Sequence, residues 1–185
     1  MIREIVIYGD PVLRTKGKPV GEINDEVRQL AADMLDTMRE ANGVGLAAQQ
    51  VGVATQLTVI DVGDAASRPS RMWVNGQEVQ PGDHMPLYLI NPQVELSREV
   101  ETGTEGCLSF PDINADISRA AHIRVRALDL SGAPVEFEAE GLLARAVQHE
   151  VDHLNGILFI DRMNSAAKAA LGGKLKRLAA GNNVR

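Results

Sequence analysis

The stretch GLLARAVQHEVDHL, residues 141–154, constrains the fold of this chain more than any other. Its apolar residues recur at intervals of three and four, which is typical of a helix with one buried face. His149 and His153 stand four residues apart, so both imidazoles project from the same side of that helix. Two imidazoles at this spacing can bind one metal ion without distorting the helix, which Gly156 would terminate.

Glu150 directly follows the first histidine and completes an H-E-x-x-H pattern. In metal enzymes with this pattern the glutamate is a general base and not a ligand. The alternative is an ordinary amphipathic helix with polar residues along one side. The chain has only 4 histidines, so composition alone rarely produces this arrangement. The pattern therefore favours a metal site, although several reaction classes share it.

A catalytic metal needs three protein ligands and an open coordination position. Downstream of His153 the one acidic candidate is Asp161, and upstream the only cysteine, Cys107, lies in EGCLSFP between a glycine and a proline. Two histidines and a thiolate would suit Zn²⁺ or Fe²⁺. The alternatives for the cysteine are a buried apolar filler or a reactive thiol. His84, in a loop-like stretch, and His122, at the start of a strand, are not expected to bind the metal.

The remaining patterns predict an α+β fold, in which mostly antiparallel strands pack around the H-E-x-x-H helix. Helices are expected near both ends of the chain, over 25–41 and 164–180. Strands are expected from Met1 and over 56–62, 86–96, 122–130 and 135–141, the last two as a hairpin. Residues 63–85 are rich in Gly, Pro, Ser and Asn, so we expect a surface insertion with loop or hairpin structure.

The 185 residues suit a single catalytic domain. The chain shows no apolar run that could span a bilayer and no targeting segment, so we expect a cytoplasmic protein without a membrane partner. The net charge of -6 argues against DNA as a substrate. From Arg162 onward, however, all the charged residues are basic. Residues 164–185 are thus expected to form a helix and a basic tail.

Three segments together resemble peptide deformylase: GVGLAAQQ (43–50), EGCLS (105–109) and QHEVDH (148–153). They match the three motifs of that family, G-x-G-L-A-A-x-Q, E-G-C-L-S and Q-H-E-x-D-H, in order and in spacing. The opening YGDPVLR is also similar, and the resemblance covers most of the chain. Three motifs in order are far more specific than H-E-x-x-H alone.

The resemblance implies one divalent metal ion per chain, Fe²⁺ in the native enzyme, with Zn²⁺, Ni²⁺ or Co²⁺ as substitutes. It implies the ligands Cys107, His149 and His153. Glu150 would take a proton from the metal-bound water and pass it to the leaving amine, while Gln50 and the backbone N–H of Leu108 would stabilise the oxyanion. The substrates implied are nascent polypeptides with N-formylmethionine, and the products are formate and a free N-terminus.

Other residues of the motifs are candidates for binding the peptide and supporting the metal. Gly43 and Gly45 free the backbone to pair with an extended peptide. The expected substrate-binding residues are Gly43, Val44, Gly45, Gly106, Leu142 and Ala146, although Val44, Leu142 and Ala146 could equally be core residues. The expected supports of the site are Glu105, Gln148 and Asp152, for which the alternative is a solvated surface position.

Two rival functions stay open: a metallopeptidase or other metal-dependent amidohydrolase, and a non-catalytic metal-binding protein. A structural zinc site normally has four protein ligands and no need of a general base. The basic C-terminal helix suggests contact with ribosomal RNA, since deformylation acts on emerging chains. A solvated helix end, with cations favoured by the helix dipole, is the alternative.

Overall fold

The computed structural model describes residues 1–63 and 67–181. The helices are α1 (Asp25–Glu40), α2 (Leu142–Leu154), α3 (Ser165–Ala170) and α4 (Gly172–Gly181), with 3-10 helices η1 (Pro11–Arg14), η2 (Ala48–Val51), η3 (Pro81–His84) and η4 (Phe159–Arg162). The strands are β1 (Gly45–Ala47), β2 (Leu57–Ile60), β3 (Ser70–Val74), β4 (Gln77–Val79), β5 (Leu87–Leu96), β6 (Val100–Cys107), β7 (Phe110–Ala120), β8 (His122–Leu128) and β9 (Pro134–Gly141). Within these residues no helix is both long and apolar enough to cross a membrane.

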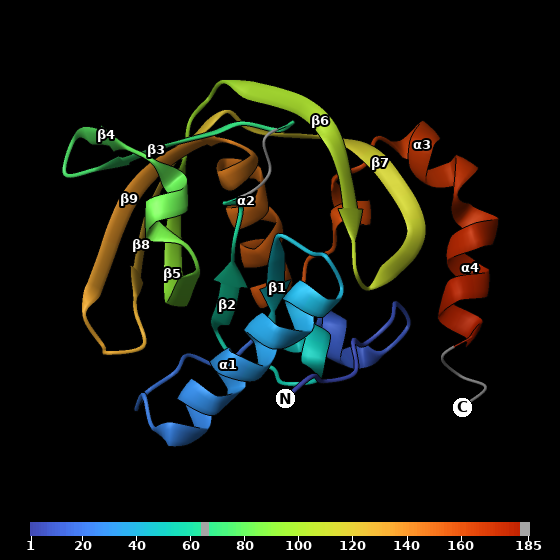
Figure 1. The fold of residues 1–185 in the computed structure, drawn as a ribbon. Coiled ribbons are helices and arrows are strands. Elements are labelled where there is room, and N and C mark those ends of the chain that lie inside the picture. The colour runs from blue at the N-terminus through green and yellow to red at the C-terminus, as the bar shows by residue number, and fades with distance from the viewer. Residues whose placement is uncertain (64–66, 182–185) are drawn as a thin grey trace.

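The strands form two sheets, in which neighbouring strands run antiparallel (Figure 1). The larger sheet has the order β1-β2-β5-β8-β9-β3-β4, and β6 and β7 form a separate long hairpin. The predicted α+β class, with mostly antiparallel strands and helices toward both ends of the chain, is confirmed. The hairpin of β8 and β9 matches the one expected from alternation of apolar and polar residues.

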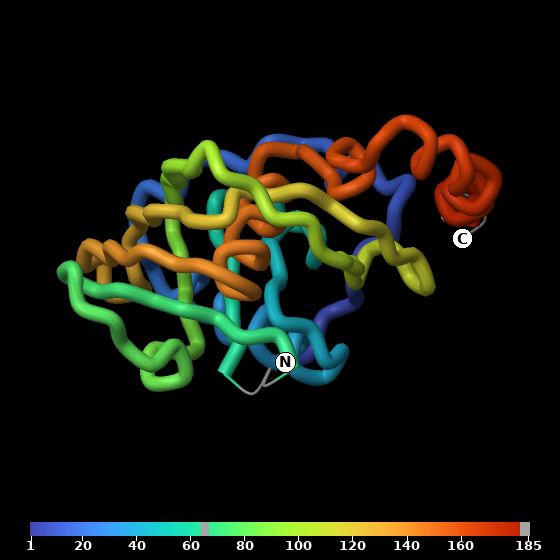
Figure 2. The backbone as a smooth tube through the Cα atoms, turned by 90° about the horizontal axis from the view of Figure 1, so that it is seen from above, coloured from blue at the N-terminus to red at the C-terminus, as the bar shows by residue number. Residues whose placement is uncertain are grey.

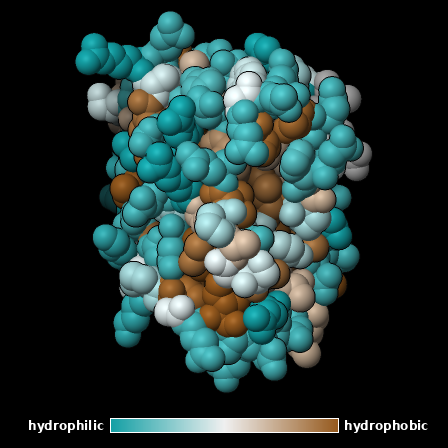
Figure 3. Space-filling view, turned by 90° about the vertical axis from the view of Figure 1, so that its left-hand side faces the viewer, coloured by the Kyte–Doolittle hydropathy of each residue, from teal (hydrophilic) through white to brown (hydrophobic). Residues whose placement is uncertain are grey.

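Helix α2 follows β9 directly and contacts β1, β2, β3 and β9 of the larger sheet as well as β7 of the hairpin. All its residues except Val151 are buried, including the polar ones. Figure 1 shows α2 in the interior, between strands of the two sheets. Because α2 is enclosed in the protein, its polar side chains need partners there. By contrast, the outer face seen in Figure 3 is largely hydrophilic, and its apolar side chains gather in hollows.

The start of α2 is held by the segment that precedes and opens β3. Gly141, at the N-cap position, has no side chain to satisfy the first helical N–H groups. Instead Leu142 N–H donates to Pro69 O over 3.1 Å, and Leu143 N–H donates to Ser70 Oγ over 2.9 Å. The helix with the histidines is therefore anchored to a segment more than 70 residues away in the sequence.

That anchoring segment belongs to residues 63–85, of which 64–66 lie outside the described residues. The rest contains β3, β4 and η3, and β3 pairs with β9 in the larger sheet. A hairpin is thus present in this region. That it is an insertion stays a prediction.

Two expected elements differ in the structure. The expected strand from Met1 is wrong: residues 1–7 belong to no sheet, although Val6 N–H donates to Gln50 O over 2.8 Å. The single helix expected over 164–180 is divided into α3 and α4 at Leu171, where Gly172 and Gly173 follow. Glycine costs helix stability, so the break falls at the glycine pair. Figures 1 and 2 place α4 at the periphery beside the β6–β7 hairpin, and residues 182–185 of the tail lie outside the described residues.

Candidate active site

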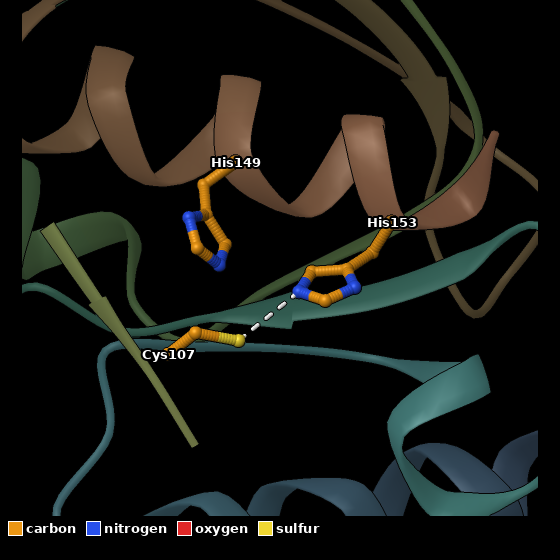
Figure 4. Close-up of side chains that lie close together, drawn as sticks. All are labelled: Cys107, His149 and His153. Carbon is orange, nitrogen blue, oxygen red and sulfur yellow. Dashed lines mark hydrogen bonds between the residues drawn. The ribbon is translucent and has the colours of Figure 1, made fainter. Parts of the chain in front are cut away.

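Three potential metal ligands meet between α2 and the end of β6. Cys107 is the last residue of β6, and His149 and His153 lie one turn apart on α2, facing it (Figure 4). Their ligand atoms all lie within 4.8 Å of one another, and Cys107 Sγ is 3.3 Å from His153 Nε2. Around one zinc ion, bonds of roughly 2.3 Å to sulfur and 2.0 Å to nitrogen place ligand atoms roughly 3 to 4 Å apart. The three residues therefore fit a single ion.

The electrostatic surroundings of the two imidazoles also suit a cation at this point. Burial lowers the pKa of His153 well below its ordinary value, which keeps the ring neutral, as a metal ligand must be. Burial opposes charge on His149 as well, but hydrogen bonds with Cys107 and Glu105 outweigh it and raise the pKa well above its usual value. The surroundings of His149 thus stabilise a positive charge, whether a proton or a metal ion supplies it.

Glu105 supports His149 from the side opposite the other ligands. Its Oε1 accepts from His149 Nδ1 over 2.9 Å, and its two oxygens accept from Arg119 over 2.8 and 2.9 Å. Arg145 Nη1 donates to Oε2 over 2.8 Å. Burial alone would raise the pKa of Glu105, but the hydrogen bonds from Arg119 and His149 hold it well below its usual range. Glu105 is therefore an ionised acceptor that leaves His149 Nε2 to face the ligand cluster.

Glu150 is enclosed beside the cluster and is only 4% exposed. Burial raises the pKa of its carboxyl group to about 7. Oε2 has no hydrogen-bond partner among the described residues, and a buried polar atom of this kind calls for a partner. Gly45 leaves the space that the carboxylate occupies, because a Cβ there would lie 2.8 Å from Oε1. A carboxyl group with a pKa near neutrality can both accept and donate a proton.

Gln50 and Leu108 lie beside Glu150 and the ligand cluster. Gln50 is 1% exposed, and its Nε2 donates to Ser109 Oγ over 3.1 Å and points at Cys107 Sγ over 3.6 Å. Its Oε1 accepts from Ala47 N–H over 3.0 Å, which fixes the orientation of the amide. Leu108 lies in the turn between β6 and β7.

A cavity of about 550 Å³ opens over this cluster. Its lining includes all six residues expected to bind substrate: Gly43, Val44, Gly45, Gly106, Leu142 and Ala146. Cys107, His149, Glu150 and Gln50 also line it. The cavity wall therefore combines the residues expected to bind substrate with Glu150 and two of the three candidate ligands, Cys107 and His149.

His122 and Asp161, which also carry possible ligand atoms, have other partners. His122 bonds Glu138 and Glu140, and Asp161 pairs with Arg14. Among the described residues, the only group of three histidine, cysteine or acidic side chains with ligand atoms this close is Cys107, His149 and His153.

The sequence pattern of the family "Polypeptide deformylase" matches residues 2–169. The chain belongs to the polypeptide deformylase family. A peptide deformylase of Methylacidiphilum infernorum is 43% identical over 184 residues, which span 100% of this chain and 96% of that protein. One of Alkalilimnicola ehrlichii is 45% identical over 178 residues, spanning 96% and 90%.

Solved structures of peptide deformylases share the fold. The crystal structure from Legionella pneumophila has a TM-score of 0.81 at 34% identity and covers 100% of this chain and 99% of that chain. The structure from Synechococcus elongatus, a complex with actinonin, has a TM-score of 0.77 at 40% identity and covers 93% and 85%. The chain is therefore an enzyme, a metallohydrolase that acts on N-formylmethionyl peptides.

In this deformylase the residues Gln148 and Asp152 lie away from the cavity. Gln148 hydrogen-bonds the backbone N–H and C=O of Ala120, both over 3.0 Å, which ties α2 to the end of β7. Asp152 accepts from Arg119 over 2.7 Å and from Arg162 over 3.0 and 3.1 Å. Among the hydrogen bonds of the described residues, its carboxylate bonds neither imidazole and is linked to that of His149 through Arg119 and Glu105.

Arg119 and Arg145 are site residues of the deformylase that the sequence did not predict. Both are buried, and both bind Glu105, which lies 14 and 40 residues away. Arg119 lies in none of the three sequence motifs. The one signal for cationic partners was Glu105, because a buried glutamate close to a metal ligand needs positive charges beside it.

Proposed function

We propose that this chain removes the formyl group from N-formylmethionyl nascent polypeptides at a divalent ion held by Cys107, His149 and His153. The observation that carries the proposal is the position of Glu150 in the wall of the cavity of about 550 Å³, where its buried carboxyl group has an unpartnered oxygen and lies beside the three candidate ligands. Fe²⁺ is the expected ion, with Zn²⁺, Ni²⁺ or Co²⁺ as substitutes, because a thiolate and two imidazoles suit all of them.

The bound ion would act as a Lewis acid that activates water and polarises the formyl carbonyl. Glu150 takes a proton from the attacking water and later delivers it to the nitrogen of the departing amine. Its pKa of about 7 suits both roles, because the carboxylate gains and loses the proton near neutral pH. The C–N bond of the formyl group then breaks, leaving formate and a free N-terminus.

The oxyanion that forms at the formyl carbon needs hydrogen-bond donors. We assign this role to the side-chain amide of Gln50 and to the backbone N–H of Leu108. Gln50 Nε2 already lies 3.6 Å from Cys107 Sγ, so the amide faces the cluster. Because Ala47 fixes the amide oxygen, the NH₂ group is aimed at the site before substrate binds.

The peptide would lie in the cavity as an extended strand. The backbone of Gly43 and Gly45 would pair with it on one side and Gly106 on the other, while Val44, Leu142 and Ala146 would line the pocket for the methionine side chain. Glu105 would orient His149, Asp152 would hold Arg119 in place, and Gln148 would fix α2 against β7. One catalytic domain spans the chain in this proposal, since both sheets contribute to a single cavity.

The test is formate release from a formyl-methionyl peptide by wild-type protein and by Glu150→Gln. We expect the substitution to leave one metal ion per chain and to reduce kcat roughly 100- to 10,000-fold. Full activity of Glu150→Gln would overturn its role as proton carrier. Cleavage of unformylated peptides at a comparable rate would instead indicate a metallopeptidase.

We also propose that α3 and α4 contact ribosomal RNA, which would place the enzyme in the cytoplasm at the site of translation. The support is the row of basic residues Lys168, Lys174, Lys176 and Arg177. Deleting the helices would disturb the fold, because Leu175 is buried against the core. Charge reversal of Lys168 and Lys176 is the better test. Unchanged co-sedimentation with ribosomes at low salt would contradict this contact.

A further inference from the structure

Most of the charged groups that line the cavity are already neutralised. Glu105 is bound by Arg119, Arg145 and His149, and Arg145 is 9% exposed. Arg68 is different, because it is an exposed cation of the cavity wall. Its Nη2 donates to the backbone oxygen of Thr104 over 2.9 Å, and it makes no ion pair with the residues that the structure describes. This guanidinium therefore keeps its charge available to a ligand.

The backbone beside Arg68 is fixed in place. Pro69 O accepts from Leu142 N–H at the start of α2, and Ser70 Oγ accepts from Leu143 N–H. The guanidinium meets β6 at Thr104. Arg68 thus directly precedes the two residues that hold the start of α2, and its guanidinium is bound to β6 at the edge of the cavity. Both α2 and β6 carry candidate metal ligands.

The distance along β6 indicates which part of a substrate Arg68 would meet. Thr104 precedes Cys107 by three residues, which is roughly 10 Å of extended strand. A peptide whose formyl group lies at the cluster would cover that distance with its first three or so residues. This step rests on the proposed function, since it takes the formyl group to lie at the cluster.

The other exposed charge of the cavity wall is Asp112 on β7. Among the described residues no ion pair joins it to Arg68, whose guanidinium bonds Thr104 O, so neither charge cancels the other by direct contact. The backbone oxygen of Asp112 accepts from Lys174 over 2.8 Å, which brings a second cation to the β7 side. Arg68 therefore has no acidic partner of its own within the described cavity wall.

We propose that Arg68 is a specificity-determining residue that favours formyl-methionyl peptides with Asp or Glu among the three residues after methionine. A guanidinium binds a carboxylate through two parallel N–H donors, a geometry that amides and hydroxyls do not match. Nη2 would keep one N–H on Thr104 O, which leaves its second N–H and the other N–H groups of the guanidinium to bind a carboxylate. The segment that precedes β3 would thereby contribute to substrate choice as well as to the start of α2.

The test uses C-terminally amidated formyl-Met-Ala-Ala-Ala peptides, in which the second, third or fourth residue is replaced by Asp or, as an isosteric control, by Asn. For the wild type we expect kcat/KM to be roughly two- to five-fold higher for Asp than for Asn at one or more positions. The difference should lie in KM and should shrink with added salt, as screening weakens exposed ion pairs. In Arg68→Gln the ratio should fall to about one, and Arg68→Lys should retain part of it.

Arg71→Gln is the matched control, because Arg71 is an exposed arginine of β3 that pairs with Glu78 and is absent from the lining of the cavity. It should keep the wild-type Asp/Asn ratio. An equal ratio in wild type and Arg68→Gln at every position would overturn the assignment, as would an equal loss for Asp and Asn peptides. Absence of formate release from all peptides would contradict the proposed function itself.

Discussion

The Nδ1–H of His149 donates to Oε1 of Glu105 over 2.9 Å, and Glu105 is an ionised acceptor. This hydrogen bond fixes the tautomer of the imidazole, so that Nε2 faces Cys107 and His153. Partners of this kind orient a ligand and increase its basicity. The proposed metal site therefore depends on a carboxylate that is itself held by two buried arginines.

Replacing Glu105 with Gln should weaken the metal site and the fold together. The amide keeps the shape but leaves Arg119 and Arg145 without their counter-charge. We expect metal affinity to fall roughly 10- to 100-fold, measured by competition with a chelator. The free energy of unfolding should fall by about 3 kcal/mol in denaturant titrations. Glu101→Gln, an exposed acid on the same strand, should change neither quantity. Unaltered metal affinity in Glu105→Gln would contradict its role.

A methyl group at position 45 should impair catalysis without removing the metal. The added Cβ of Gly45→Ala would lie 2.8 Å from Oε1 and 2.9 Å from Cγ of Glu150, so the buried carboxylate must move. Displacement of a catalytic group by about 1 Å can cost roughly 100-fold in rate, and we expect a decrease in kcat of that order. Gly21→Ala is the control, since a Cβ there meets nothing within 4 Å. A wild-type kcat in Gly45→Ala would argue against a fixed position for Glu150.

Removal of the Ser70 hydroxyl should destabilise the start of α2. Ser70 Oγ accepts from Leu143 N–H and takes the place of an N-cap side chain. We expect Ser70→Ala to lower the free energy of unfolding by about 1 kcal/mol, as for the loss of an N-cap. Ser67→Ala, at an exposed position in the same segment, should have little effect. If Ser70→Ala and Ser67→Ala were equally stable, the hydrogen bond from Leu142 N–H to Pro69 O would be enough to hold the start of α2.

His122 should stabilise the fold in a pH-dependent way. Its two ring nitrogens lie 2.9 Å from Glu138 and 3.0 Å from Glu140, and these hydrogen bonds raise its pKa. The stabilisation is fully present below the unfolded pKa of about 6.5 and is lost as the pH rises through the folded pKa. His122→Gln should therefore lower the free energy of unfolding at about pH 5.5, by no more than about 1 kcal/mol because the groups are partly exposed. At about pH 9 wild type and variant should be equally stable. A larger loss of unfolding free energy at about pH 9 than at about pH 5.5 would contradict the stabilising role of protonated His122.

The sequence predicted the elements whose patterns are local. Helix α1 and the hairpin of β8 and β9 follow from helical and alternating periodicity, and their bounds lie within two residues of those expected. The arrangement of His149, Glu150 and His153 also depends only on helical spacing. Donor chemistry made Cys107 a candidate third ligand, and the family resemblance selected it among the alternatives, because no local pattern reports a contact across 46 residues.

Features that depend on distant contacts escaped prediction. Strand β6 contains two glycines and two glutamates, which have low strand propensity, and it forms because it pairs with β7 over its whole length. Arg119 has its two partners 14 and 33 residues away. The N-terminal residues have strand-like composition, yet residues 1–7 join neither described sheet, and Val6 N–H instead donates to Gln50 O. In each case tertiary contacts decided the outcome over local preference.

The most direct test of the account is formate release from formyl-methionyl peptide by protein purified without oxygen, with its metal content measured. We predict one divalent ion per chain, loss of activity when a chelator removes it, and recovery when Fe²⁺ is restored. Cys107→Ala should lose both the ion and the activity, because a catalytic site needs its third protein ligand. Formate release by metal-free protein at the wild-type rate, or its absence from protein with one ion per chain, would contradict the account.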